Sequence, residues 1–330
     1  MMHQSRIRRL RAEAKVRGLD SVLVSSHADI YYYTGLRLSG DDAGFLLVGR
    51  KSRPVFFASP LNNEAAGMEA AEVVFIRTFE DVGKHLGGGS VGFDEYHTSC
   101  HLFSRMRKLG VKWRRAAEAI KSPRAIKDGH EVGQMRRGLK INRSVLDGLD
   151  IVGKTERQVS REIFCGFAER GATAAFETIV ASGRNSSFIH YTPRERRIRS
   201  RDLVVIDFGA KVGGYCTDMT RTFCSRPGRK ERGLIDDVKG MQSAIIGEAH
   251  AGAAFSGLQS AWERMMMEKG YKVMHGVGHG IGLEVHEGSR SEVLKAGMVI
   301  TVEPGVYLPG FGGCRIEDMI LIKKGRSRIL

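Results

Sequence analysis

The sequence predicts two domains: an α/β domain over residues 1–122 and an α+β domain over residues 123–330. The chain of 330 residues is longer than a typical single domain of about 100–200 residues. Short β-rich runs alternate with helical stretches in the first part, whereas longer helices and paired strand-like runs fill the second. The boundary is placed at 121–128, where KSPRAIKD holds the only proline between Pro60 and Pro193 among polar residues.

The N-terminal domain is expected to begin with a helix, because Ile7, Leu10 and Ala14 recur at spacings of three and four. Gly18 and Asp20 are turn residues that end it. Strands are expected in the β-rich runs at 21–26, 30–35, 44–49, 54–59, 73–77 and 90–95. Because helical stretches separate several of these runs, the pattern indicates an α/β domain.

The C-terminal domain is expected to open with a long helix over 130–152, in which Val132, Met135 and Leu139 share one face. The other helices are expected at 155–169, 231–250 and 255–269, and the strands at 175–182, 203–210, 215–224, 297–303 and 314–322. Helices and strands in this order, without a regular alternation, predict an α+β domain.

Composition excludes several classes of protein. Apolar residues make up 42% and charged residues 27%, which is typical of a globular chain rather than a disordered one. The sequence contains no run of 18 apolar residues and no recognisable signal peptide, so we expect a cytoplasmic protein that does not cross a membrane. The five cysteines lack CxxC spacing and are expected to be reduced thiols.

The chain is basic, with 52 Lys and Arg against 37 Asp and Glu, a net charge of +15. The basic residues are scattered, and no zinc-finger, RNA-recognition or helix-turn-helix signature accompanies them. This distribution favours a solvated surface over contact with nucleic acid, although a weak polyanion contact stays an alternative.

The strongest local feature is VVIDFGAKVGGYCTDMTRTF at 204–223. Asp207 and Asp218 are equidistant from a turn centred between Val212 and Gly213. In an unbulged hairpin they would face each other with Cβ atoms about 4.5–5.5 Å apart. The apolar neighbours indicate burial, and two buried carboxylates repel unless a cation lies between them. The hairpin therefore predicts a metal site.

Histidines and glutamates downstream extend this site. HGVGHGIGLEVHE at 275–287 holds three histidines among alternating glycines, which indicates extended backbone pressed against a neighbour. Either His275 or His279 could be a metal ligand, and His286 could bind substrate or move protons. Glu303 and Glu317 follow in apolar strands, where an unpaired carboxylate is costly.

Together Asp207, Asp218, His279, Glu303 and Glu317 make four carboxylates and one imidazole. That set suits two divalent ions such as manganese, cobalt or zinc. Two such ions can polarise a carbonyl group and generate hydroxide near neutral pH, so the expected reaction is hydrolysis. The alternative for each glutamate is a structural salt bridge, with Arg315 as a candidate partner.

Nearly the whole chain resembles the pita-bread metallopeptidases, and within them the Xaa-Pro dipeptidases (prolidases) and Xaa-Pro aminopeptidases. RLRAEAKVRGLDSVLVSSHADIYYYTGL is similar to the start of a creatinase-like N-terminal domain, and SPRAIKDGHEVGQMRRGLKI to the entry of the catalytic domain. IDFGAKVGGYCTDMTRTF, HGVGHGIGLEVHE, TVEPGVY and RIEDMILI follow in the family's order. The resemblance implies cleavage of the peptide bond before proline, by a homodimer.

The resemblance also implies a role for each residue. Asp207 would bind one ion, His279 and Glu303 the other, and Asp218 and Glu317 both. A hydroxide between the ions would attack the scissile carbonyl, with Glu303 moving the proton. His190, in SSFIHYTP, and His286 would orient substrate and stabilise the tetrahedral intermediate, while Arg315 would bind acidic groups or hold the ligands. His275 matches a family position that is not a ligand.

Three alternatives remain at this stage. Methionine aminopeptidases have the same five ligands but generally lack such an N-terminal domain, and creatinases have that domain without the ligands. The third alternative is a non-catalytic pita-bread module that binds nucleic acid or basic or acidic proteins. Such relatives generally lose ligands, whereas this sequence keeps all five. Arg201-Asp202 and the basic run RERRIRSR depart from the family pattern at the expected rim of the cleft.

Overall fold

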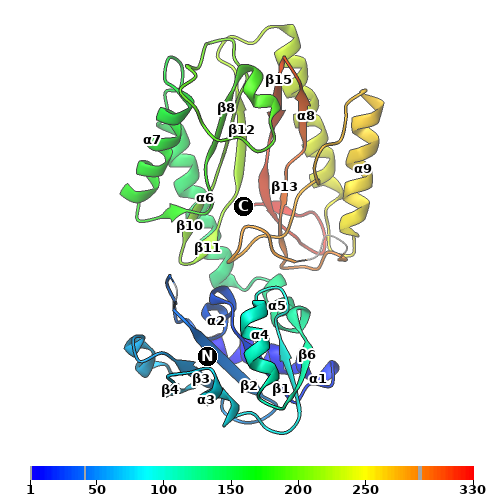
Figure 1. The fold of residues 1–330 in the computed structure, drawn as a ribbon. Helices are drawn as coiled ribbons and strands as arrows, with labels where there is room; N and C mark the ends of the chain where they lie inside the picture. The colour runs from blue at the N-terminus through cyan, green and yellow to red at the C-terminus, as the bar shows by residue number, and fades with distance from the viewer. Residues whose placement is uncertain (1, 41, 289–291) are drawn as a thin grey trace. The chain divides into compact units, whose positions relative to one another are not determined.

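The computed structural model describes residues 2–40, 42–288 and 292–330. The chain forms two compact units, Met1–Arg124 and Ala125–Leu330, so their division falls two residues beyond the end of the expected N-terminal domain. Each unit in Figure 1 has its own sheet system and its own helices. No helix within the described residues is long and apolar enough to span a bilayer.

The N-terminal unit is built on one six-stranded mixed sheet with the order β4-β3-β2-β1-β5-β6. β1 pairs with β2 and β2 with β3 in antiparallel fashion, whereas the β3–β4, β1–β5 and β5–β6 pairs are parallel. The strands are β1 (Ser21–Val24), β2 (Gly44–Gly49), β3 (Val55–Ala58), β4 (Glu72–Phe75), β5 (Ser90–Phe93) and β6 (Lys112–Arg115). The helices are α1 (Met2–Val16), α2 (His27–Thr34), α3 (Glu80–Gly83), α4 (Cys100–Arg107) and α5 (Ala117–Ala125), with a 3₁₀ turn η1 (Asn63–Gly67).

One strand prediction in this unit is wrong, because residues 30–35 belong to helix α2 and its C-cap. Ser26 is the N-cap, and its side chain accepts a hydrogen bond from the Asp29 N–H. Gly35 ends the helix with φ +80°, a conformation that glycine adopts without strain. Burial of Tyr32 on the helix overrides the strand preference of the aromatic run.

The C-terminal unit has helices on the outside and several short sheets within (Figure 1). The helices are α6 (Gly129–Asp147), α7 (Glu156–Glu169), α8 (Arg229–Glu248) and α9 (Phe255–Glu268), with a 3₁₀ turn η2 (Gly183–Ser187). The strands are β7 (Thr173–Ala174), β8 (Ile179–Ser182), β9 (Val204–Phe208), β10 (Ala210–Val212), β11 (Tyr215–Cys216), β12 (Met219–Phe223), β13 (Val299–Val302), β14 (Gly305–Leu308), β15 (Gly312–Arg315), β16 (Asp318–Leu321) and β17 (Arg328–Ile329). The expected α+β organisation is confirmed.

Two sheets of this unit carry the residues of interest. The first has the order β12-β9-β8 and the second β13-β16-β17, both antiparallel. The two sheets approach each other where β12 contacts β16, and β12 also contacts β15 of the separate β14-β15 sheet. The unit has two halves, one with strands β7–β12 and one with strands β13–β17. Helices α6 and α7 contact strands of the first half, and α8 contacts β13, β14 and β15 of the second.

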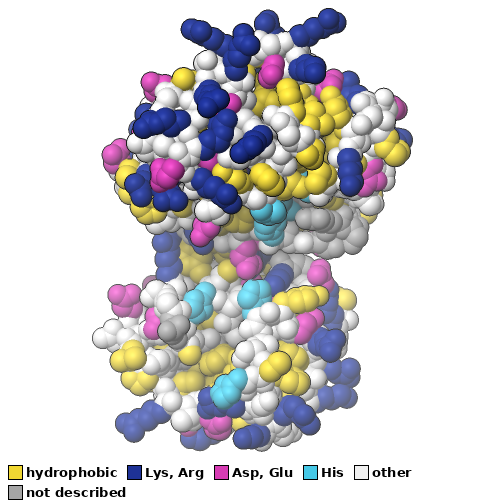
Figure 2. All heavy atoms as spheres, turned by 45° about the horizontal axis from the view of Figure 1, so that its top comes forward, with side chains coloured by type: hydrophobic (Ala, Val, Ile, Leu, Met, Phe, Trp, Pro, Cys, Tyr) yellow, Lys and Arg dark blue, Asp and Glu magenta, His cyan; other side chains and the backbone are white. Residues whose placement is uncertain are grey.

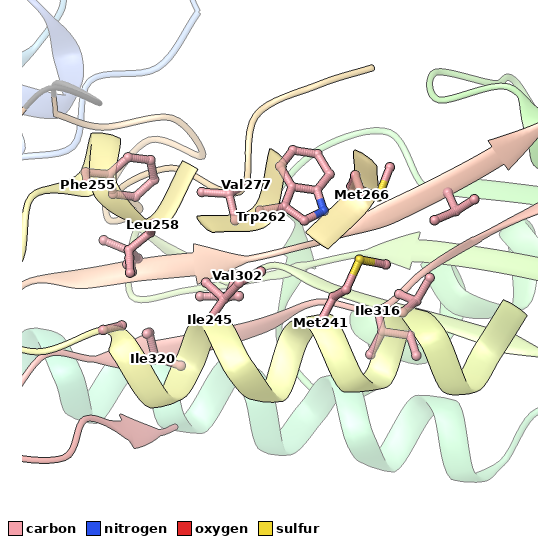
Figure 3. Packing of buried hydrophobic residues seen from close by; sticks show 14 of the residues in the cluster. Met241, Ile245, Phe255, Leu258, Trp262, Met266, Val277, Val302, Ile316 and Ile320 are labelled. Carbon is pink, nitrogen blue, oxygen red and sulfur yellow. The ribbon is translucent and has the colours of Figure 1, made fainter. Parts of the chain in front are cut away.

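The main core of this unit lies between α8, α9 and the strands they cover (Figure 3). Val238, Met241 and Ile245 recur at three and four residues along α8 and are fully or almost fully buried. Trp262 from α9 packs in the same cluster as Val302 of β13. Because this core fixes the end of β13, the residue that follows Val302 has a rigid support.

The surface is strongly basic without a single basic stripe in the view of Figure 2, where Lys and Arg side chains lie among uncharged and acidic ones on each unit. All five cysteines are free, as expected for reduced thiols. Cys216 and Cys314 are buried, and burial raises the pKa of the Cys314 thiol to about 12.

Candidate metal centre

The hairpin that carries the two aspartates turns one residue later than expected. Gly213 and Gly214 form its two-residue loop with φ +58° and +86°, the left-handed conformations that such a turn requires. Asp207 therefore pairs with Thr220, and the expectation that it directly faces Asp218 is wrong. Asp218 lies two residues before Thr220 and is a diagonal neighbour of Asp207 on the same side of the hairpin.

Three of the acidic residues lie at breaks between strands, and at Asp218 and Glu317 the break interrupts a strand that we expected to be continuous. Asp218 lies between β11 and β12, Glu303 between β13 and β14, and Glu317 between β15 and β16. The Glu317 N–H donates to the Thr220 carbonyl at 3.1 Å, which joins the two halves of the unit at this point. The interruptions allow carboxylates from separate strands to turn toward one space.

The structure brings the predicted ligands together. Ligand atoms of Asp218, His279 and Glu317 all lie within 4.8 Å of one another, and the three side chains are buried. His279 Nε2 lies 3.6 Å from Asp218 Oδ2 and 3.4 Å from Glu303 Oε1. The backbone of His279 is held by Thr301, whose Oγ1 accepts from the His279 N–H at 3.0 Å. A Cβ on Gly278 would lie 2.1 Å from the Thr301 carbonyl oxygen, so the backbone is pressed against its neighbour as expected.

The electrostatics of the cluster show how near the acidic groups are. Burial, and then the negative charges of Glu317, Asp207 and Glu303, raise the pKa of Asp218 well above its usual range. Burial, Glu303 and Asp207 likewise raise the pKa of Glu317, although the charge of Arg315 works in the opposite direction. Four carboxylates, two of them buried and two partly buried, therefore repel one another in this cluster.

The chemistry of these donors fits divalent cations. Oδ1 of Asp207, Oδ1 of Asp218 and Oε1 of Glu317 are buried, and none has a hydrogen-bond partner among the described residues. Buried carboxylate oxygens without donors are costly, and a cation that binds them removes both this cost and the mutual repulsion. Carboxylate and imidazole ligands without a thiolate suit manganese, cobalt or zinc.

Arg315 is buried behind the ligands, with 3% of its surface exposed. Its Nη2 lies 2.7 Å from Asp207 Oδ2, and its Nε donates to Thr220 Oγ1 at 3.2 Å. The Thr220 hydroxyl in turn donates to Glu317 Oε2 at 2.8 Å. Arg315 thus pairs directly with Asp207, and it reaches Glu317 through Thr220 rather than through the direct salt bridge considered as an alternative.

The histidines occupy different positions around this cluster. The His286 ring is exposed, and its centroid is 4.2 Å from that of His279. His190 is exposed in the loop after η2, and the carbonyl of the preceding Ile189 accepts from Arg315 Nη1 at 3.4 Å. His275 contacts the Tyr307 hydroxyl at 3.0 Å.

Sequence reasoning missed two residues that support the ligands. Tyr307 accepts from Arg315 Nη1 at 2.7 Å, and burial raises its pKa to about 12. Thr220 links Arg315 to Glu317. The period of two along the strand places Thr220 on the same side as Asp218, and this signal would have identified it.

The fold and the donor set define the class of this protein as a pita-bread metal-dependent peptidase. The chain belongs to metallopeptidase family M24, whose profile matches residues 105–324. Residues 6–126 match the creatinase/prolidase N-terminal domain. Both matches confirm the resemblance stated from the sequence motifs.

Named relatives cover almost the entire chain. A protein of Pyrococcus horikoshii named Xaa-Pro dipeptidase is 33% identical over 328 residues, which are 94% of this chain and 92% of the relative. The solved structure of a Xaa-Pro dipeptidase from Bacillus anthracis matches with a TM-score of 0.92 at 28% identity, over 99% of this chain and 97% of that one. An X-Pro aminopeptidase from Thermotoga maritima matches with a TM-score of 0.87 at 28% identity, over 98% and 96%.

Proposed function

We propose that this metallopeptidase hydrolyses the peptide bond before proline, in Xaa-Pro dipeptides or at the N-terminal Xaa-Pro of longer peptides, with two divalent ions per chain. The observation that carries the proposal is the set of three buried carboxylate oxygens without donors, on Asp207, Asp218 and Glu317. The likeness to proteins named for Xaa-Pro cleavage supports the choice of substrate.

Asp207 would hold one ion and His279 with Glu303 the other, and Asp218 and Glu317 would bind both. Manganese, cobalt or zinc suits these ligands. When bound, the ions would polarise the scissile carbonyl and supply a bridging hydroxide as the nucleophile near neutral pH.

Side chains of the protein would transfer the proton, orient the substrate and hold the metal ligands. Glu303 would pass a proton to the leaving proline nitrogen, a role supported by its side chain being 19% exposed, more than that of Asp218 or His279. The exposed imidazoles of His190 and His286 would orient the substrate and donate to the oxygen that becomes negative. Arg315 holds Asp207, and its burial favours this role over direct binding of substrate.

A peptidase assay that varies both the peptide substrate and the added metal tests the proposal. The chelator-treated protein is assayed on Ala-Pro, Ala-Pro-Ala and Met-Ala-Ser with manganese, cobalt or zinc added in turn. We expect cleavage before proline that requires metal, and the ratio of the first two rates separates a dipeptidase from an aminopeptidase. Cleavage of Met-Ala-Ser alone would indicate a methionine aminopeptidase. A protein that binds no metal and cleaves none of the peptides would support the non-catalytic binding module.

We also propose that the protein is a homodimer, as the resemblance implies, and that it is cytoplasmic, as expected from the sequence. Light scattering during size-exclusion chromatography measures its mass directly, and a mass of 36.5 kDa for the active species would contradict the dimer.

A further inference from the structure

A fully buried glutamate outside the metal centre holds the loop that carries His190. Glu156 is the first residue of α7, and none of its surface is exposed. The loop it contacts connects β8 to β9 and includes η2, and His190 follows η2. A buried carboxylate is costly unless donors surround it.

Glu156 accepts five hydrogen bonds from this region. Its Oε1 accepts from the N–H of Ser182 at 2.8 Å, from the Ser182 hydroxyl at 2.7 Å and from Asn185 Nδ2 at 3.1 Å. Its Oε2 accepts from the Tyr191 hydroxyl at 2.8 Å and from the N–H of Arg194 at 3.2 Å. These donors run from Ser182, at the end of β8, to Arg194, near the middle of the loop, so one side chain holds the backbone on both sides of His190.

The Tyr191 hydroxyl and the N-terminus of α7 both stabilise the negative charge of Glu156. Burial, followed by the hydrogen bond and negative charge of Glu156, raises the pKa of Tyr191 to about 12, so the phenol keeps the proton that it donates. The Tyr191 ring also stacks on Phe188, with centroids 6.1 Å apart. Glu156 lies at the N-terminus of its helix, where the helix dipole favours a negative charge.

The opposite side of the loop is held by β15 and the metal centre. The Gly313 N–H donates to Ser186 Oγ at 2.8 Å, and Arg315 Nη1 donates to the Ile189 carbonyl at 3.4 Å. His190 thus lies between Ile189, held by Arg315, and Tyr191, held by Glu156.

We propose that Glu156 is a positioning residue that fixes the imidazole of His190 through Tyr191 and the loop backbone. This inference rests on the proposed function, because it assigns His190 to the substrate. Glu156 itself touches neither substrate nor metal. Glu156 restricts the backbone conformations on either side of His190 before substrate binds. Less conformational entropy is then lost when the imidazole contacts the substrate.

The test combines Glu156→Gln with His190→Ala in a double-mutant cycle on Ala-Pro hydrolysis. If Glu156 acts through His190, Glu156→Gln lowers kcat/KM by about 10²-fold in the natural background. In the His190→Ala background the same change has an effect of less than about twofold, because the group it positions is gone. The matched control is Glu162→Gln on the same helix, whose carboxylate is exposed and pairs with Lys154 at 2.7 Å, and it leaves kcat/KM unchanged.

A second readout does not need turnover. In protein labelled on histidine carbons, the Cε1–H signal of His190 is assigned by its loss in His190→Ala. Glu156→Gln should shift or broaden this signal while the metal content and the circular dichroism spectrum stay unchanged. If Ala-Pro is not cleaved, the proposed function fails, and the His190 signal still tests the positioning role.

The proposal is overturned if the effects of Glu156→Gln and His190→Ala multiply, or if the His190 signal is unchanged. If Glu156→Gln does not fold, Tyr191→Phe replaces it, because this variant removes only the hydroxyl, with its hydrogen bonds to Glu156 and Asn185, and keeps the stack with Phe188. Tyr191→Phe should shift the same signal, and an unshifted signal would equally reject the proposal.

Discussion

Arg315 Nη2 lies 2.7 Å from Oδ2 of Asp207, while Oδ1 of the same carboxylate is buried without a hydrogen-bond partner among the described residues. The guanidinium therefore satisfies one oxygen and leaves the other free to bind a cation. This division of one carboxylate between a protein cation and a metal explains how a buried arginine and metal ions can occupy neighbouring positions.

Replacing Arg315 should destabilise the protein strongly. Arg315→Met leaves the largely buried carboxylate of Asp207 without its cation and should lower the free energy of unfolding by about 3 kcal/mol in urea titrations. Lys154→Met breaks an exposed pair and should cost about 0–1 kcal/mol. Equal losses of unfolding free energy in the two variants would show that the Arg315–Asp207 pair contributes no more to stability than a surface ion pair.

The stability of the metal-free protein should depend on pH through Asp218. Its pKa is raised in the folded state, chiefly by burial and then by the neighbouring carboxylates, so folding favours its protonated form. The stability it contributes is present below its unfolded pKa of about 4 and is lost as pH rises through the folded value. With a chelator present, wild type should therefore lose stability relative to Asp218→Asn as the pH rises above about 4. If the free energy of unfolding of wild type and of Asp218→Asn changed with pH in the same way, the raised pKa of Asp218 would be contradicted.

His286→Ala should impair turnover more than metal binding. The exposed imidazole packs on His279, and the proposed function assigns it to the substrate. Loss of a proton donor at this position should lower kcat by about 10²-fold or more, with the metal content of the purified protein unchanged. If restoring full metal occupancy restored full activity, His286 would be a support for the metal and not a substrate-binding residue.

Gly209→Ala should disrupt the hairpin at the point where the two aspartates approach. A Cβ at this position would lie 1.8 Å from the Thr217 carbonyl oxygen, and the partner is backbone that cannot turn away. We expect a lower melting temperature and weaker metal binding, because Asp218 follows Thr217 directly. Gly240→Ala on the exposed side of α8 meets no neighbouring atom and should stabilise the protein by about 0.5–1 kcal/mol. A Gly209→Ala variant as stable as wild type would refute the close approach.

The helical periodicities and the motifs predicted much of this structure. The apolar spacing from Val132 to Leu139 correctly indicated α6, and the acidic residues in apolar strands correctly indicated a buried acidic cluster. Helix α2 was missed because a single N-cap and a buried tyrosine outweigh a local strand preference at 30–35. The hairpin register was missed because two adjacent glycines allow the turn at either of two positions, and sequence symmetry cannot choose between them.

The breaks in the strands at Asp218 and Glu317 could not be predicted from hydropathy. A strand reads as continuous when its apolar residues continue on both sides of one acidic residue. The breaks depend on contacts between distant strands, such as the hydrogen bond from Glu317 to the Thr220 carbonyl, 97 residues apart in sequence. Glu156 was missed for the same reason, because its partners lie in a loop far along the chain.

The most direct test of the metal centre is anomalous diffraction from crystals of the protein grown with manganese. The account predicts two anomalous peaks per chain, both at bonding distance from carboxylate oxygens, with Asp218 and Glu317 touching each peak. Asp207 should ligate one ion, and His279 with Glu303 the other. Manganese peaks elsewhere on the chain, with these five side chains free of metal, would contradict the account.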